Sequence, residues 1–211
     1  MDLFKKDLII VYNQDAQRRK ENEESRDSWK FNVREKFLDL LKSEHKKTLL
    51  ELGAGIGTDS KYFMDNGLDI LAVDISEGMI KECLEKGVNA QVMDLYDIES
   101  LGKKFDAVYS MNVMLHIPRK DLESILNKIS DVLNKGGLFY YGSYGGITEE
   151  IVKNDAKTKY LPRFFSKLND EDLLTATSMF DKVDFEVVEL NSDQKGFHYQ
   201  SLTLRKKGGS S

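Results

Sequence analysis

The sequence is poor in cysteine, since Cys83 is the only one among 211 residues. A single thiol excludes an internal disulfide and any metal site built from several cysteines, and we expect no bound metal. Long apolar runs are missing too. None approaches the roughly 18 residues of a membrane helix, and MDLFKKDLIIVYNQD has too short an apolar core for a signal peptide. We therefore expect a cytoplasmic protein with no membrane partner.

An excess of positive charge is also missing, because the net charge is −5. Such a chain has no general attraction to phosphate backbones, so a nucleic-acid partner is disfavoured. No repeat or low-complexity linker divides the chain, which favours one domain over residues 1–207. The final GGSS, residues 208–211, resembles an engineered linker. The pattern indicates no oligomeric state.

Residues 1–45 are expected to form an N-terminal helical cap. Apolar residues recur at helical spacing between Asp27 and Lys42. Residues 13–28 contain almost nothing apolar, which is typical of a solvated helix face or a mobile segment. The preceding LFKKDLIIVY fits a helix or a strand, and we favour a helix.

Strand and helix patterns alternate over residues 46–144, the expected cofactor-binding core. This alternation predicts an α/β fold of parallel βαβ units with helices on both faces of the sheet. The last helix of the core is expected to stop at Gly136-Gly137. Strands are expected at 48–52, 69–75, 89–93, 105–111 and 137–144, and helices at 57–66, 76–86 and 119–134.

The remainder of the chain departs from this alternation. Residues 145–180 exceed the length that a connection needs, which predicts a substrate lid on the catalytic face. Residues 181–207 contain the strand patterns KVDFEVVEL and FHYQSLTLRK, with no room between them for a helix. These two strands are therefore expected to pair antiparallel.

The stretch TLLELGAGIGTDS, residues 48–60, predicts a ligand pocket at the carboxyl end of the first strand. Its glycines let the backbone approach a ligand, and the helix that follows presents free N–H groups. A dinucleotide fingerprint needs a small third residue where Thr58 stands, so that motif fails at one position. A tight strand-to-helix turn without a ligand is the alternative. Glu51 lies two residues before the first glycine, where a carboxylate suits a cationic or amine-bearing ligand.

The second strand, LAVDIS, ends in Asp74, a carboxylate placed to accept both hydroxyls of a ribose. The alternative is an ordinary N-cap of the next helix, a role that Ser76 fills equally well.

Four segments together resemble the class I S-adenosylmethionine-dependent methyltransferases, in particular the bacterial small-molecule type. They are ELGAGIGTDS, AVDISEGMI, VMDLYD and FDAVYSMNVMLHIP, in the family's order and near its spacings. The resemblance covers residues 48–143 well and the rest loosely. It implies a Rossmann-like, seven-stranded, mostly parallel sheet with an antiparallel last strand. It also implies S-adenosyl-L-methionine as cofactor and S-adenosyl-L-homocysteine as product.

The same resemblance assigns roles residue by residue. Met79 has plain helix core as its alternative, and Asp94 has a turn cap. The methionine part of the cofactor would lie against Glu51, Gly53, Ala54, Gly55 and Gly57; the ribose against Asp74; the adenine against Ile75, Met79, Asp94 and Leu95; and the sulfonium near Ser110, Met111 and Asn112.

His116, in MLHIP at the rim of the fourth strand, is the candidate catalytic base, and a loop-fixing hydrogen bond is its alternative. No N/D-P-P-Y motif and no basic extension appear, which favours a small-molecule or peptide methyl acceptor with oxygen, nitrogen or sulfur as the methylated atom. YLPRFFSKLNDEDL resembles a tail common in the bacterial enzymes, in which an arginine precedes an aromatic pair, and from this resemblance a role for Arg163 in gripping a carboxylate is conceivable. Candidate acceptor-binding residues, for which packing of the lid is the alternative, are Tyr12, Trp29, Tyr141, Tyr144, Tyr160 and Arg163.

The leading hypothesis is thus a methyltransferase that moves a methyl group to an O or N nucleophile of a small molecule by in-line displacement. A protein that binds S-adenosylmethionine without catalysis, as a partner or sensor, is a second hypothesis. An NAD(P)-dependent oxidoreductase is a third, although the region around Thr58 offers no pyrophosphate site.

Overall fold

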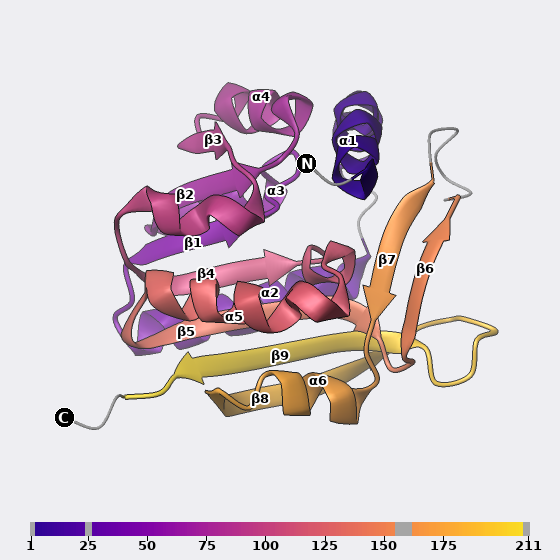
Figure 1. The fold of residues 1–211 in the computed structure, drawn as a ribbon. Coiled ribbons are helices and arrows are strands. Elements are labelled where there is room, and N and C mark those ends of the chain that lie inside the picture. The colour runs from indigo at the N-terminus through magenta and orange to yellow at the C-terminus, as the bar shows by residue number, and fades with distance from the viewer. Residues whose placement is uncertain (1–2, 24–26, 155–161, 209–211) are drawn as a thin grey trace.

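A seven-stranded sheet forms the centre of the protein (Figure 1). The structure is a computed structural model that describes residues 3–23, 27–154 and 162–208. The strands lie in the order β3-β2-β1-β4-β5-β9-β8, and β9 runs antiparallel to both of its neighbours. This confirms the expected mostly parallel sheet with a reversed last strand. The strands are β1 Thr48–Leu52, β2 Asp69–Asp74, β3 Ala90–Val92, β4 Phe105–Met111, β5 Leu133–Gly145, β8 Phe180–Glu189 and β9 His198–Lys206.

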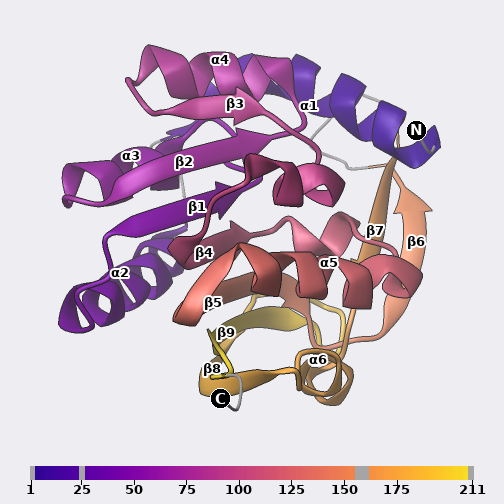
Figure 2. The same cartoon turned by 60° about the vertical axis from the view of Figure 1, so that its left-hand side comes forward.

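Helices cover both faces of this sheet (Figures 1 and 2). Side chains alternate across a strand, so Leu49 packs with Phe37 and Phe63 on one face while Leu50 packs with Ile125 on the other. The helices are α1 Leu3–Glu21, α2 Ser28–Ser43, α3 Thr58–Asp65, α4 Glu77–Glu85, α5 Arg119–Val132 and α6 Asp170–Ala176, with short 3-10 helices η2 Leu95–Leu101 and η3 Met114–His116. Among the described residues, no helix is both long and apolar enough to cross a membrane.

One boundary prediction was wrong. The helix expected at 119–134 ends at Val132, and β5 begins at the next residue, so Gly136-Gly137 lies inside the strand. Gly136 has φ +68°, and the pairing of β4 with β5 shifts register between Phe105 and Ala107. The glycines therefore accommodate an irregularity in the strand instead of ending the helix.

Two elements frame the carboxyl ends of the core strands. The α1 helix extends through most of the polar segment, to Glu21, and lies against α4 (Figure 2). The hairpin of β6 Glu149–Lys153 and β7 Arg163–Lys167, which the sequence patterns did not predict, stands beside the other end of α1. The rings of Phe4 on α1 and Phe164 on β7 lie 5.4 Å apart between their centres. The helix α1 and the hairpin thus enclose the carboxyl ends of the core strands.

Candidate active site

The glycine loop after β1 places three residues in the left-handed region, with φ +63° at Gly53, +54° at Gly55 and +78° at Gly57. The space beside these glycines differs. A Cβ at Gly53 would lie 2.2 Å from Val113 Cγ2, and one at Gly57 would lie 2.9 Å from Cys83 Sγ, so close packing requires both. A Cβ at Gly55 would meet nothing within 4 Å. Of the three, only Gly55 has open space beside it.

Asp74 ends β2 with its carboxylate buried under α1. Gly55 N donates to its Oδ2 and Ser76 N donates to its Oδ1, both at 2.9 Å. Burial raises the pKa of Asp74, and the backbone donors oppose that rise. The N-cap of α4 is Ser76, whose Oγ accepts from Met79 N at 3.1 Å. The alternative reading of Asp74 as the helix cap is therefore wrong, and two acceptor positions remain on its carboxylate.

Asp94, at the end of β3, does cap the turn that follows, because its Oδ1 accepts from Tyr96 N at 3.1 Å. Its Oδ2 accepts from Lys5 Nζ of α1 at 2.8 Å. Lys5 also lies 3.4 Å from the centre of the Tyr96 ring. A cation from α1 therefore reaches the carboxylate for which the resemblance implies an adenine contact.

Two further polar groups lie at the ends of β1 and β4. Glu51 is 3% exposed and accepts a hydrogen bond from Ser60 Oγ. Asn112 has φ +61°, a conformation that side chains other than glycine adopt rarely, and its N donates to Gly142 O at 2.8 Å. Within the part of the chain that the structure describes, Asn112 Oδ1 is a buried acceptor with no donor. A buried acceptor of this kind beside the cavity is a candidate ligand contact.

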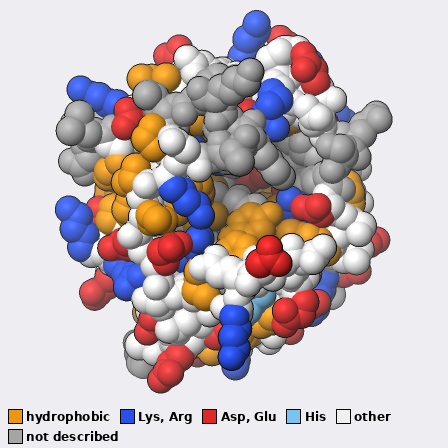
Figure 3. Space-filling view, turned by 90° about the vertical axis from the view of Figure 1, so that its right-hand side faces the viewer, with side chains coloured by type: hydrophobic (Ala, Val, Ile, Leu, Met, Phe, Trp, Pro, Cys, Tyr) orange, Lys and Arg blue, Asp and Glu red, His pale blue; other side chains and the backbone are white. Residues whose placement is uncertain are grey.

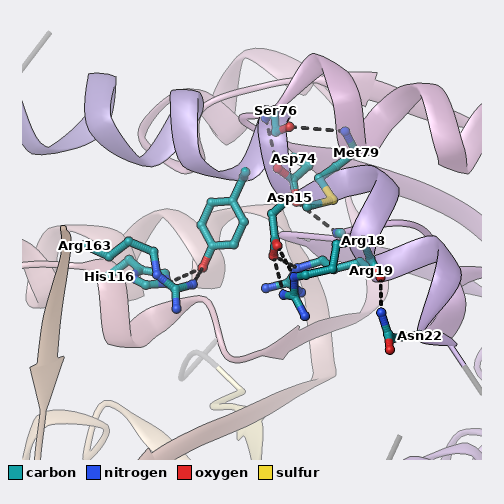
Figure 4. A network of polar contacts seen from close by, with 11 residues as sticks. Asp15, Arg18, Arg19, Asn22, Asp74, Ser76, Met79, His116 and Arg163 are labelled. Carbon is teal, nitrogen blue, oxygen red and sulfur yellow. Dashed lines mark hydrogen bonds and ion pairs between the residues drawn. The ribbon is translucent and has the colours of Figure 1, made fainter. Parts of the chain in front are cut away.

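A second polar group joins α1, η3 and the hairpin (Figure 4). His116 Nδ1 lies 2.7 Å from the carbonyl oxygen of Phe164, so this nitrogen carries the proton. In the neutral ring Nε2 is then an acceptor, and Tyr12 Oη donates to it at 2.7 Å. Arg163 Nη1 donates in turn to Tyr12 Oη at 3.1 Å. One tautomer satisfies all three contacts.

Burial keeps both His116 and Tyr12 uncharged, and nearby cations add to this effect at His116 only. Desolvation, with the charges of Arg163 and Arg19, lowers the pKa of His116 to about 4. Burial raises the pKa of Tyr12, although the same cations oppose that rise. His116 is thus uncharged near neutral pH and hydrogen-bonded at both nitrogens, as its loop-fixing alternative requires.

A single cavity of about 870 Å³ connects the glycine loop with this second group. Its volume lies near the upper end of the range for small-molecule sites, roughly 300 to 1,000 Å³. It brings together most of the residues that the sequence singled out. Those in its wall are Glu51, Gly53, Ala54, Gly55, Asp74, Ile75, Asp94, Leu95, Met111, Asn112, Tyr12, His116, Tyr144 and Arg163.

Other candidates lie behind the wall. Met79 is fully buried with Ala16 and Ile56, as its core alternative states. Trp29 forms a second layer, 6.4 Å from Tyr144 between ring centres. Gly57, Ser110 and Tyr141 are also outside the cavity wall as far as the described residues show, and Tyr160 lies outside the described residues.

Sequence reasoning missed several residues of the wall. Phe165 and Lys167 reach the cavity from β7 beside the predicted Arg163, because alternate residues of a strand share one face. That spacing in RFFSK was the available signal, but the segment was assigned as a lid without strands. Lys5 of α1 and Lys153 of β6 also line the cavity and had no sequence signal of their own.

A family model described as a methyltransferase domain matches residues 49–137, which hold the glycine loop, Asp74, Asp94 and Asn112. The chain contains a methyltransferase domain. Solved structures share this arrangement of strands and helices. One is an S-adenosylmethionine-dependent methyltransferase from Clostridium acetobutylicum, with a TM-score of 0.69 and 14% identity over 93% of this chain and 99% of that one.

Two other proteins are similar to this chain. The 1,6-didemethyltoxoflavin-N1-methyltransferase of Burkholderia thailandensis, solved with 1,6-didemethyltoxoflavin and S-adenosylhomocysteine bound, has a TM-score of 0.64 and 20% identity over 94% of this chain and 88% of that one. Phosphoethanolamine N-methyltransferase 3 of Arabidopsis thaliana is 28% identical over 108 residues, 48% of this chain and 22% of that protein. The chain spans less than a third of the length of the first curated relatives that it matches.

Proposed function

We propose that this chain is an S-adenosylmethionine-dependent methyltransferase that acts on an O or N nucleophile of a small molecule. The observation that carries the proposal is the single cavity. At one end it holds the glycine loop, the buried carboxylates of Glu51 and Asp74 and the partly buried Asp94, and at the other the Tyr12-His116-Arg163 group. A cofactor and an acceptor held at these two ends would meet beside Asn112.

The residues present fit the cofactor. The ribose hydroxyls suit the two remaining acceptor positions of Asp74. The amino group and sulfonium carry positive charge, which suits Glu51 and the buried acceptor Asn112 Oδ1. Open space beside Gly55 lets a ligand lie directly on the backbone. The adenine amino group is assigned to Asp94, where it shares the carboxylate with Lys5.

When bound, the cofactor supplies a methyl group already activated by its positive sulfur. The acceptor atom bonds to the methyl carbon while the carbon–sulfur bond breaks and its electron pair stays on sulfur. The main task of the protein is then to hold the acceptor in line with that bond, an effect worth up to roughly 7 to 11 kcal/mol. Tyr144 and Phe197 are suited to this task, since their stacked rings lie 5.9 Å apart between centres in the cavity wall.

His116 is proposed to receive the proton that the acceptor loses, by way of Tyr12. The hydroxyl of Tyr12 already points its proton at His116 Nε2, so an acceptor bound at Tyr12 Oη has a path for its proton. A group with a pKa of about 4 is a weak base at neutral pH. This path therefore requires that the bound acceptor raise the pKa of His116.

The experiment is calorimetric titration of the purified protein with S-adenosylmethionine, S-adenosylhomocysteine and NAD(P)H in parallel. The proposal expects micromolar binding of the two sulfur compounds and none of the nicotinamide. Binding of the nicotinamide alone would overturn it.

Turnover separates an enzyme from a sensor. Incubation of the protein with S-adenosylmethionine and amine or hydroxyl acceptors, phosphoethanolamine among them because it is named in the relatives, should release S-adenosylhomocysteine with at least one acceptor. Binding without any acceptor-dependent release, across a broad panel, would favour the sensor.

A further inference from the structure

We infer that the methyl acceptor is an uncharged, planar aromatic compound whose ring packs against Tyr144 and Phe197. This inference rests on the proposed function and adds the chemical class of the acceptor. It follows from the position of these two rings in the cavity wall, from the contacts that hold them in place and from the chemistry of Tyr12 and His116.

Tyr144 and Phe197 lie on the side of the sheet that the cofactor would leave open. The carboxylates assigned to the cofactor lie at the ends of β1, β2 and β3, and the order β3-β2-β1-β4-β5-β9 places β4 between those strands and β5. Tyr144 belongs to β5, Phe197 directly precedes β9, and both line the cavity. The two rings therefore stand beyond β4 from the ribose and adenine positions, where a second ligand would bind.

The same rings are close to the place where the methyl group would move. Asn112 N donates to Gly142 O at 2.8 Å, and Tyr144 follows Gly142 by two residues on β5. Two residues of a strand span about 7 Å. This is comparable with the length of a small aromatic molecule. A planar acceptor that packs on Tyr144 can thus place its reacting atom beside Asn112.

The aromatic pair is held in place by further rings. The planes of Tyr144 and Phe197 differ by only 9°, with 5.9 Å between centres. Trp29 and Tyr199 each meet Tyr144 nearly at a right angle, at 89° and 83°, and lie 4.3 Å from each other between centres. Because these contacts already order the pair, a ligand that extends the stack costs little side-chain freedom on binding.

The surroundings of the pair favour an uncharged ligand. Lys167 Nζ lies 5.2 Å from the centre of the Phe197 ring and is paired with Glu149 Oε2 at 2.7 Å. Lys30 of the cavity wall is paired in the same way with Asp27, at 2.7 Å. On the face that carries the hairpin, hydrophobic side chains gather in the floor of a hollow (Figure 3). A charged group placed there would lose water without gaining a partner, whereas a neutral ring would not.

The proton path also suits an acceptor atom bonded to an aromatic ring. As that atom bonds to the methyl carbon, its proton passes to Tyr12 Oη, and the proton of Tyr12 passes to His116 Nε2. The carbon–sulfur electron pair stays on sulfur. A hydroxyl on an aromatic ring has a pKa of about 10, as in tyrosine, because the ring spreads the charge. An aromatic amine is uncharged at neutral pH and releases its proton readily once methylated. Such protons reduce the rise in the pKa of His116 that the path requires.

The test is calorimetric titration of the protein, saturated with S-adenosylhomocysteine, with two matched pairs of probes. These are 2-naphthol with decahydro-2-naphthol and phenol with cyclohexanol, so that each pair differs only in whether the ring is aromatic. In at least one pair the aromatic probe should bind about two- to tenfold more tightly than its saturated counterpart, the range expected for aromatic stacking.

The variants ask whether this preference comes from the proposed rings. Tyr144→Leu and Phe197→Leu should each reduce the preference for the aromatic probe toward onefold and leave the affinity for the saturated probe nearly unchanged. Tyr144→Phe keeps the ring and should keep the preference. Phe31→Leu, which replaces an exposed ring of α2 outside the cavity wall, should also keep it.

The affinity for S-adenosylhomocysteine is the control for folding and for the proposed function. If Tyr144→Leu no longer binds it, Phe197→Leu and Tyr144→Phe decide. Normal binding of S-adenosylhomocysteine with no aromatic preference in either pair overturns this inference alone, even if phosphoethanolamine is turned over. A preference that both leucine variants retain overturns it too. A wild-type protein that binds no S-adenosylhomocysteine overturns the proposed function instead.

Discussion

Replacing Asp74 with asparagine should weaken cofactor binding strongly without unfolding the protein. Each carboxylate oxygen already accepts one backbone N–H, from Gly55 and from Ser76, which leaves one position on each for a ribose hydroxyl. An asparagine has only one oxygen, so one hydroxyl loses its acceptor and the other keeps a neutral one. Hydrogen bonds to charged groups contribute about 1.5 to 3 kcal/mol and neutral ones about 1, so the total loss is roughly 2 to 5 kcal/mol.

In affinity this loss corresponds to a factor of about 30 to 4,000, since 1.4 kcal/mol is tenfold. Calorimetric titration with S-adenosylhomocysteine measures it. Asp69→Asn is the matched control, because Asp69 is exposed at the opposite end of the same strand and should change nothing. A dissociation constant for Asp74→Asn within about threefold of the wild type, with an unchanged unfolding temperature, would refute the ribose assignment.

Four further predictions concern the stability of the protein and its affinity for the cofactor. Gly57→Ala should lower the free energy of unfolding by about 1 to 3 kcal/mol, because φ is +78° and the methyl group meets Cys83. Gly55→Ala also places a Cβ at positive φ, which should cost about 1 kcal/mol of stability, but the open space beside it means that the larger effect should be a loss of cofactor affinity in the same titrations. Tyr12→Phe removes a donor and an acceptor, so denaturant unfolding should show a loss of about 1 to 3 kcal/mol. The folded pKa of His116, about 4, is below its ordinary 6.5, so stability falls as pH drops between these values, by about 3 kcal/mol, and His116→Gln should flatten that part of the unfolding curve.

The core of the fold follows from local patterns that tertiary contacts reinforce. The limits of β1 and β4 agree with the apolar runs TLLEL and FDAVYSM, because buried parallel strands are apolar throughout. The glycine pair at Gly136 led to a wrong prediction of where α5 ends. Glycine is common just after helices, but it also occurs where a strand is irregular. The β6–β7 hairpin was not predicted because its two strands are only five residues long and show no strict apolar alternation.

The sequence predicted the residues of one end of the candidate site better than those of the other. The cofactor end is built from strand ends and one loop. Its residues, Asp74 among them, therefore come after successive strand patterns, where a sequence motif can mark them. The acceptor end joins Tyr12, His116 and Arg163, and 104 residues separate the first two. Only the folded chain brings them together, and no local pattern records a contact of that kind.

The α1 helix explains why the two ends belong to one site. Lys5 contacts Asp94, Asn13 Oδ1 accepts from both Ser76 Oγ and Gly78 N, and Tyr12 contacts His116, all from the same nineteen-residue helix. Its polar residues looked like a solvated surface because they face a polar cavity instead of an apolar core. The same helix covers Asp74 and Asp94, where the ribose and adenine of the cofactor are proposed to bind. It also supplies the hydroxyl of Tyr12 to the acceptor end. A cofactor that displaces Lys5 from Asp94 would therefore act on the helix that holds Tyr12, which couples cofactor binding to the shape of the acceptor end.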